Sequence, residues 1–105
     1  MSPKRQRQTE GGVATSKEAR ARPPARHKVL LHNDDYTTQD FVTGVLETIF
    51  RLPPDEAQRR MLEVHQRGVT IAGVYSREVA ESKAQKVIEL ARARDFPFLA
   101  TVEPE

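Results

Sequence analysis

The chain of 105 residues contains no cysteine and no tryptophan, and aromatic residues make up only 6% of it. Without cysteine, the protein has no disulfide, no thiol nucleophile and no thiolate metal site. No apolar stretch approaches the roughly 18 residues that a membrane span needs, and the first residues lack the apolar core of a secretory signal. From length and composition we expect one small soluble domain that works in the cytoplasm, without a membrane partner.

Positive charge is concentrated at the start of the chain. Residues 1–27 carry seven basic and two acidic residues, a net charge of +5, whereas residues 28–105 carry ten basic and thirteen acidic residues, a net charge of −3. The first part contains no aromatic residue, leucine or isoleucine. Because it has too little apolar surface to offset the entropy of ordering, we expect a disordered basic tail over residues 1–27. Such a tail suits a solubilising arm or a contact with an anionic partner and, less well because amphipathic spacing is missing, an organelle transit peptide.

From residue 28 onward, apolar residues recur with the periods of strands and helices. Short apolar runs predict strands at 28–32, 69–75 and 98–102. Apolar residues three and four positions apart predict helices that begin near residues 38, 54 and 76, the last running to about residue 94. Pro53 and Pro54 separate the first two helices, and Gly68 ends the second. The order β-α-α-β-α-β in one domain, 28–105, predicts an α+β fold with helices packed on a three-stranded sheet.

A polar run, HNDDYTT, follows the first predicted strand at residues 32–38. On the second predicted helix, His65 lies on or beside the inward face, next to Met61 and Val64. Taken separately, the loop is typical of a solvated turn, and the histidine is typical of a hydrogen-bonded, partly buried residue. Taken together, they suit a pocket with apolar walls that holds a cation between carboxylate, amide and imidazole groups.

Other functions have weaker support in the sequence. Asp34, Asp35, His65 and His32 are of the types that bind metals, but no HExxH-type spacing fixes two ligands on one helix face. The serines lie in the tail or on the third predicted helix, without the motif of an activated nucleophile. Residues 28–105 are acidic overall, and their aromatic residues are not interleaved with basic ones as in a nucleic-acid platform. We therefore expect no enzyme activity, no cofactor or metal, and no nucleic-acid partner.

Three segments resemble the ClpS family, the adaptor proteins of the ATP-dependent Clp protease: HNDDYTTQDFV, MLEVHQRG and GVYSREVAESKAQKV. The similarity extends over residues 28–103, with the segments in the family's order and spacing. It implies a three-stranded antiparallel sheet packed against three helices. Since that fold also resembles the C-terminal domain of the ribosomal stalk protein, the fold alone leaves open a stalk-like protein interaction module.

The resemblance implies a monomeric adaptor that binds substrates through a destabilising first residue, an N-degron of Leu, Phe, Tyr or Trp, and delivers them to the ClpA unfoldase of the ClpAP protease. By position in the motifs, Asn33, Asp35 and His65 would bind the free α-amino group, with Asp34 supporting the loop. The residues implied to line the hydrophobic side-chain pocket are Leu31, Thr37, Gln39, Val42, Met61, Val64 and Phe98. Those implied to contact the N-terminal domain of the unfoldase are Tyr75, Glu78 and Lys83, and the tail over residues 1–27 would engage the unfoldase during delivery.

Two positions depart from the family's pattern. Gln39 stands where the family often has methionine, and its polar end resists burial without a hydrogen-bond partner. We therefore expect a changed preference among Leu, Phe, Tyr and Trp, or among bulky and β-branched first residues. Phe98 stands where a smaller aliphatic residue is common and would narrow the pocket.

Overall fold

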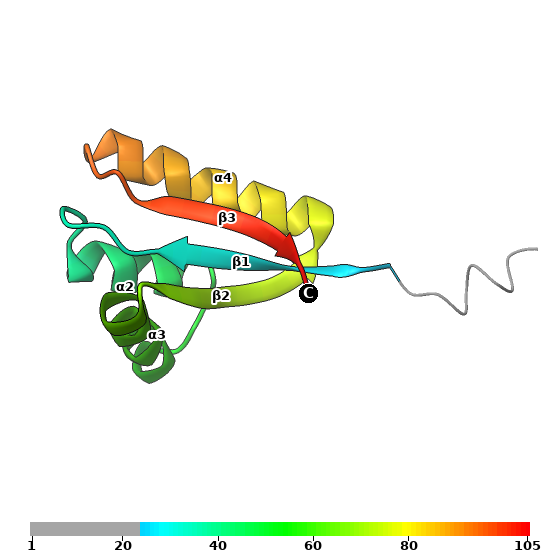
Figure 1. Cartoon of the computed structure of the whole chain (residues 1–105), viewed down its shortest axis with the longest axis horizontal. Coiled ribbons are helices and arrows are strands. Elements are labelled where there is room, and N and C mark those ends of the chain that lie inside the picture. The colour runs from blue at the N-terminus through cyan, green and yellow to red at the C-terminus, as the bar shows by residue number, and fades with distance from the viewer. Residues whose placement is uncertain (1–23) are drawn as a thin grey trace, which may run out of the picture.

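The computed structural model describes residues 24–105, and most of the expected disordered tail, residues 1–23, lies outside the described residues. The elements follow the predicted order (Figure 1). They are β1 (Arg26–His32), α2 (Gln39–Thr48), α3 (Pro54–Arg67), β2 (Val69–Ser76), α4 (Arg77–Ala93) and β3 (Leu99–Pro104). The strands form one antiparallel sheet in the order β2-β1-β3, so the predicted fold is confirmed and β1 is the central strand.

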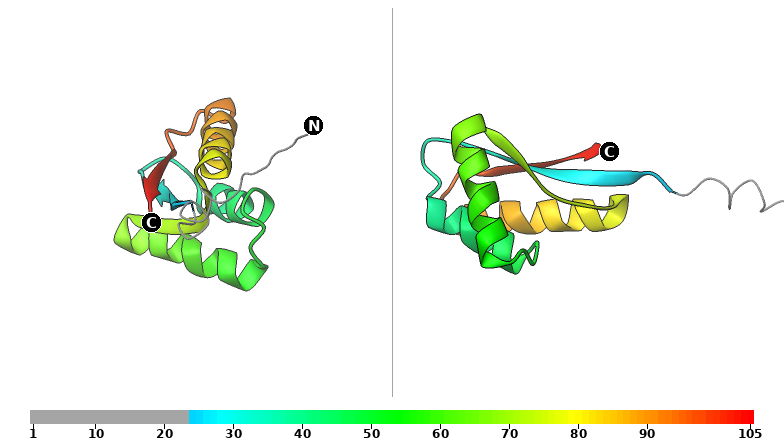
Figure 2. Two further views of the ribbon diagram at one scale, coloured as in Figure 1. Left: turned by 90° about the vertical axis from the view of Figure 1, so that its right-hand side faces the viewer. Right: turned by 90° about the horizontal axis from the view of Figure 1, so that it is seen from below.

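The helices cover one face of the sheet (Figures 1 and 2). On the covered face, alternate strand residues such as Val29, Leu31 and Ala100 are buried. Residues between them point to the other face, where Ile71 and Leu99 remain 38% and 48% exposed. This alternation is the pattern of an antiparallel sheet with one packed and one open side.

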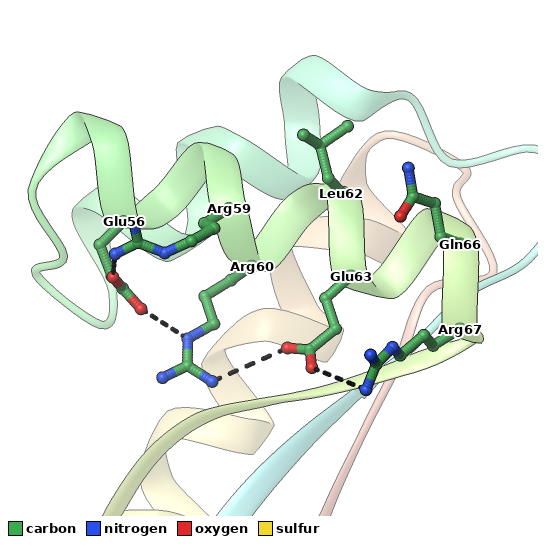
Figure 3. A pocket seen from close by; sticks show the side chains of 7 residues that line it. All are labelled: Glu56, Arg59, Arg60, Leu62, Glu63, Gln66 and Arg67. Carbon is green, nitrogen blue, oxygen red and sulfur yellow. Dashed lines mark hydrogen bonds and ion pairs between the residues drawn. The ribbon is translucent and has the colours of Figure 1, made fainter.

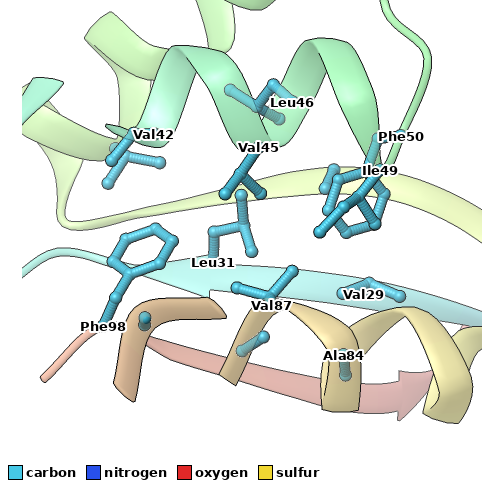
Figure 4. Packing of buried hydrophobic residues seen from close by; sticks show 14 of the residues in the cluster. Val29, Leu31, Val42, Val45, Leu46, Ile49, Phe50, Ala84, Val87 and Phe98 are labelled. Atoms are coloured by element: carbon cyan, nitrogen blue, oxygen red, sulfur yellow. The ribbon is translucent and has the colours of Figure 1, made fainter. Parts of the chain in front are cut away.

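The hydrophobic core lies between the sheet and the helices (Figure 4). The predicted inward stripe of α2 is fully buried and faces Leu31 of β1 and Val87 of α4. Of the residues predicted to face inward on the other two helices, only Ile88 is partly rather than fully buried. The periodic apolar residues therefore packed as the sequence predicted. The buried inward residues of the three helices are Val42, Val45, Leu46, Ile49, Ala57, Met61, Val64, Ala80, Ala84, Val87 and Ala91.

All three strands differ in length from the prediction, and β2 does so by one residue, because it ends at Ser76 instead of residue 75. Strand β1 begins at Arg26, two residues earlier than expected, because Arg26 pairs with Ser76 and its carbonyl accepts the backbone N–H of Glu105 at 2.8 Å. Strand β3 runs from Leu99 to Pro104 instead of 98–102, because it pairs with β1 along its whole length. The last two residues of the predicted tail, Arg26 and His27, thus belong to the sheet.

Helix ends are set by the residues that the sequence marks. The Thr38 hydroxyl accepts the backbone N–H of Phe41 at 3.1 Å and begins α2, while the Ser76 hydroxyl accepts that of Val79 at 3.3 Å and begins α4. Helix α3 ends at Gly68, whose φ of 90° lies in the left-handed region that glycine adopts without strain.

Candidate functional site

A pocket of about 220 Å³ lies where the loop after β1 meets the start of α2 and the last turns of α3. Its lining combines polar groups from the loop and from the end of α3 with apolar groups from both helices. The lining residues are Asn33, Asp34, Asp35, Thr37, Gln39, Val42, Met61, Val64 and His65. All nine were named from the sequence, and the fold brings them together although up to 32 positions separate them.

The carboxylate of Asp34 holds the loop in one conformation. Its Oδ1 accepts the backbone N–H groups of Tyr36 and Thr37, each at 2.8 Å, and its Oδ2 accepts the Thr37 hydroxyl at 2.7 Å. Partial burial alone would raise the pKa of Asp34, but the Thr37 hydroxyl and the two backbone donors together hold this pKa below its ordinary value. Asp34 is therefore ionised at neutral pH and engaged with the donors of its own loop.

The loop is tied to α3 through the glycine that ends the helix. The backbone N–H of Asn33 donates to the carbonyl of Gly68 at 2.9 Å, and the N–H of Gly68 donates to the carbonyl of Val64 at 2.8 Å. His65 lies in the last turn of α3, and its side chain is exposed. Because Gly68 joins the loop to α3, the side chains of Asn33 and His65 lie at the same pocket.

The inner wall of the pocket is apolar and rigid. Val42, Met61 and Val64 are 5%, 4% and 1% exposed, so they belong to the close-packed core as well as to the pocket. Thr37 and Gln39 lie at the start of α2 and border this wall. The pocket therefore joins a preformed apolar surface to a polar rim of carboxylate, amide and imidazole groups.

This arrangement suits a ligand with a cationic end and an apolar end. Asp35 offers acceptors for a protonated amine, while the side-chain carbonyl of Asn33 and an unprotonated imidazole nitrogen accept hydrogen bonds without adding charge. Within residues 24–105, no three His, Asp or Glu side chains come together as they would to hold a metal ion. Thr37, the one hydroxyl in the lining, already donates to Asp34.

Two residues expected in the pocket lie elsewhere. Leu31 is completely buried and Phe98 is 3% exposed, and both pack in the core between β1, α2 and α4 (Figure 4) without lining the pocket. Phe98 contacts Phe41 edge-to-face at 6.1 Å between ring centroids. The lining of this pocket does not include them, and their role in binding a substrate side chain stays a prediction.

His32, the alternative metal ligand, is also placed outside the pocket. Its Nε2 lies 2.7 Å from the hydroxyl oxygen of Thr101 on the neighbouring strand β3. His32 is partly buried there and is not among the residues that line the pocket. His32 and His65 therefore have different surroundings, and of these two only His65 lines the pocket.

The residues expected to contact an unfoldase gather at a second hollow, of about 470 Å³, between the end of α2 and the start of α4. Glu78 and Lys83 line it, and Tyr75 lies beside it, with its ring centroid 5.2 Å from the Lys83 ammonium. Partial burial raises the pKa of Tyr75 above its ordinary value. The sequence analysis did not identify the other residues that line this hollow. A signal was present for two of them, because Ser82 and Lys86 follow Glu78 at a spacing of four and so share its helix face. The further lining residues are Thr48, Ile49, Arg51, Val79, Ser82 and Lys86.

Lys83 also has a structural role at this hollow. Helix α2 has no basic residue in its last turn, and the Lys83 ammonium from α4 donates to the carbonyl of Ile49, the C-cap residue of α2, at 2.8 Å. A cation at this end also interacts favourably with the helix dipole. Lys83 therefore joins the two helices that form the hollow.

A third hollow, of about 450 Å³, lies on the outer face of α3 (Figure 3). Its charged side chains form ion pairs with one another along the helix. Arg60 bonds Glu56 at 2.8 Å and lies 3.8 Å from Glu63, which in turn lies 3.9 Å from Arg67. Because these pairs have the i,i+3 and i,i+4 spacing of helix surface contacts, they account for this face without a ligand.

In the part of the chain that the structure describes, no helix combines the length and apolar character of a membrane span.

Comparison with known proteins gives consistent matches. The family model described as ATP-dependent Clp protease adaptor protein ClpS matches residues 22–101. The Clp protease adapter protein ClpS of Desulfatibacillum aliphaticivorans is 50% identical over 95 residues, covering 90% of this chain and 91% of that protein. The ClpS of Xanthomonas oryzae pv. oryzae is 54% identical over 81 residues, covering 77% of this chain and 76% of that protein.

A solved structure is also similar. It is that of Agrobacterium tumefaciens ClpS2 bound to L-phenylalaninamide, with a TM-score of 0.76 and 41% sequence identity, covering 79% of this chain and all of that one. The fold, the order of the motifs and the relatives therefore agree over nearly the whole described chain. The protein belongs to the ClpS family, the adaptor proteins of the ATP-dependent Clp protease.

Proposed function

We propose that this adaptor binds substrate proteins by a bulky apolar first residue, Leu, Phe, Tyr or Trp, and delivers them to a ClpA-type unfoldase. An adaptor has no catalytic step of its own, so its specificity is set by what its pocket holds. The observation that carries the proposal is the meeting of a polar rim and an apolar wall in one pocket of about 220 Å³.

The two halves of the pocket match the two halves of a protein's N-terminal residue. A free α-amino group has a pKa of about 8, so it is mostly a cation at neutral pH. Asp35 supplies the charge complement, while Asn33 and His65 supply further acceptors at the same rim. The side chain of the residue then lies against Val42, Met61 and Val64. An internal residue has no free amine, and a small first residue leaves the apolar wall uncovered.

The energies show why both halves are needed. Each hydrogen bond to the charged amine contributes about 1.5–3 kcal/mol, and burial of a Leu or Phe side chain contributes about the same. Three such bonds and one side chain give about 6–12 kcal/mol before the cost of association is subtracted, which is compatible with micromolar binding, about −8 kcal/mol. Neither half reaches that affinity alone.

The related structure supports the same reading. L-phenylalaninamide, the molecule bound to Agrobacterium tumefaciens ClpS2, carries a free α-amino group and an aromatic side chain, with an amide in place of the rest of a peptide. It therefore presents both features of the proposed substrate end in one small molecule.

Delivery requires a second surface, and we assign it to the hollow between α2 and α4. Glu78, Lys83 and the neighbouring Tyr75 lie there, away from the pocket residues, so substrate and unfoldase can be bound at once. We further propose that the adaptor acts as a monomer in the cytoplasm, where the ATP-dependent partner works, and that residues 1–27 engage the unfoldase during delivery.

Fluorescent peptides that differ only in residue one test the proposal. We expect micromolar binding of Phe, Leu, Tyr and Trp peptides, weak binding of an Ala peptide, and none of an N-acetylated Phe peptide. His65→Ala should weaken Phe-peptide binding about tenfold or more, the loss of one hydrogen bond to a charged group. His32→Ala is the matched control, because His32 bonds Thr101 outside the pocket, and it should leave binding unchanged. Binding that ignores acetylation would refute the mechanism and favour a stalk-like interaction module.

The delivery surface has its own test. Glu78→Lys should reduce capture of the adaptor by the isolated N-terminal domain of a ClpA-type unfoldase without changing peptide affinity. Glu89→Lys, on the same helix but outside the hollow, is the control. Equal capture of both variants would show that the unfoldase binds another face.

A further inference from the structure

Tyr36 is the most exposed large hydrophobic side chain in the described part of the chain, at 76%. It makes no part of the core, and it is absent from the partly buried residues that pack against the core. Its exposure is therefore not explained by folding. Tyrosine is enriched among the residues that contribute most to binding at protein interfaces, and its ring offers a large contact surface with few rotatable bonds.

The backbone fixes where this ring begins. The N–H of Tyr36 donates to Asp34 Oδ1 at 2.8 Å, in the same turn that holds Thr37. Asp35 and Thr37, on either side, line the pocket, whereas Tyr36 does not. The loop thus presents the residues on either side of Tyr36 to the pocket and leaves the tyrosine itself exposed to solvent next to them in the chain.

A bound substrate must pass this rim. When the amine and side chain of the first residue occupy the pocket, the next Cα lies only about 3.8 Å farther along the chain. The second residue therefore emerges beside the loop that carries Tyr36. Resting on the proposed function, we propose that Tyr36 contacts the side chain of the substrate's second residue and favours a large apolar side chain there.

The chemistry of the ring determines the preference. An apolar second side chain removes part of the ring face from water, while the tyrosine hydroxyl stays hydrated at the edge. A glycine offers no side chain for this contact. A contact of this kind changes affinity by about three- to tenfold. Tyr36 would thus extend recognition from one residue to two without altering the amine pocket.

The test uses three ligands: L-phenylalaninamide, a Phe-Leu peptide and a Phe-Gly peptide that is otherwise identical. The intact chain should bind the Phe-Leu peptide about three- to tenfold more tightly than the Phe-Gly peptide. Tyr36→Ala should bring this ratio close to one and leave phenylalaninamide binding unchanged, since that ligand has no second residue. Tyr36→Phe should keep the ratio, and Leu99→Ala, which removes an exposed apolar side chain from the open face of the sheet, should keep it as well.

Two results would overturn the inference while the proposed function stands. One is an unchanged ratio in Tyr36→Ala with phenylalaninamide still bound. The other is an equal loss for all three ligands in a variant that unfolds at the normal temperature, which would show that Tyr36 acts on the loop itself. Failure of the intact chain to bind phenylalaninamide would instead refute the proposed function, and this inference with it.

Discussion

The role of Asp34 gives the sharpest prediction, because its three hydrogen bonds separate geometry from charge. Asp34→Ala removes the acceptors of two backbone N–H groups and of the Thr37 hydroxyl. In a loop that water reaches, each bond is worth about 0.5–1.5 kcal/mol, so the loop loses about 2 kcal/mol. Since Asn33 and Asp35 flank Asp34, we expect Phe-peptide affinity to fall by up to about 30-fold.

Asp34→Asn is the matched variant. The asparagine carbonyl can still accept both backbone N–H groups, and the Thr37 hydroxyl can turn to accept from the new amide. We therefore expect a loss of less than about fivefold, close to one weakened bond. Peptide titration of both variants, with urea unfolding as the check on folding, measures the difference. An asparagine variant that binds as poorly as the alanine variant would refute the reasoning, because charge rather than loop geometry would then dominate.

Three further predictions concern other positions and pH. The pKa of Asp34 is lower in the folded chain than its ordinary value of 3.8. Its ionised form therefore adds stability that is complete above pH 3.8 and is lost as the pH falls through the folded pKa. The difference in unfolding free energy between the intact chain and Asp34→Asn should accordingly shrink below about pH 4. Gly68→Ala should destabilise the folded chain by about 1 kcal/mol, because φ is 90° at this position. Gly44→Ala, at a helical position with nothing within 4 Å of the added Cβ, should stabilise it by about 0.5–1 kcal/mol. Thermal unfolding measures both, and equal effects of the two substitutions would contradict this reasoning. Lys83→Met removes the bond to the Ile49 carbonyl and should cost about 1–2 kcal/mol in urea unfolding, while Lys86→Met should be nearly neutral.

Much of the fold was predictable because its signals are local. The stripe from Val42 to Ile49 and the stop at Gly68 depend on neighbours three or four positions away, and the structure confirms both. The ends of β1 and β3 were wrong by about two residues. Strand ends depend on a partner strand that is distant in sequence, as the bond from Glu105 to the Arg26 carbonyl illustrates.

The sequence predicted which residues line the pocket, but not how far the pocket extends into the core. The motifs named all nine residues that line the pocket. The resemblance to the family also implied Leu31 and Phe98, which are buried in the core and do not line the pocket. Periodicity tells which face a side chain points to, but not how far from that face a pocket reaches. The helix-capping bond of Lys83 was likewise invisible, because it joins residues 34 positions apart.

Gln39 is the position at which sequence and structure together pose a measurable question. Its side chain is exposed at the mouth of the pocket, and no hydrogen bond to it occurs among the described residues. Gln39→Met should therefore raise the affinity for Leu and Phe peptides by about two- to fivefold, through added apolar contact. The same titration as above measures this, and unchanged affinity would mean that the side chain at this position does not reach the ligand.

The hydrogen bond from the backbone N–H of Asn33 to the Gly68 carbonyl makes this N–H proton a reporter on the whole site. That proton exchanges with solvent only when the loop and the end of α3 move apart, which is also the motion that would separate Asn33 from His65. Its exchange rate therefore counts how often the empty site comes apart, without any ligand being added. A slow exchange rate means that the site is already formed before a substrate binds. A fast exchange rate means that the loop and the end of α3 must come together again before each substrate can bind.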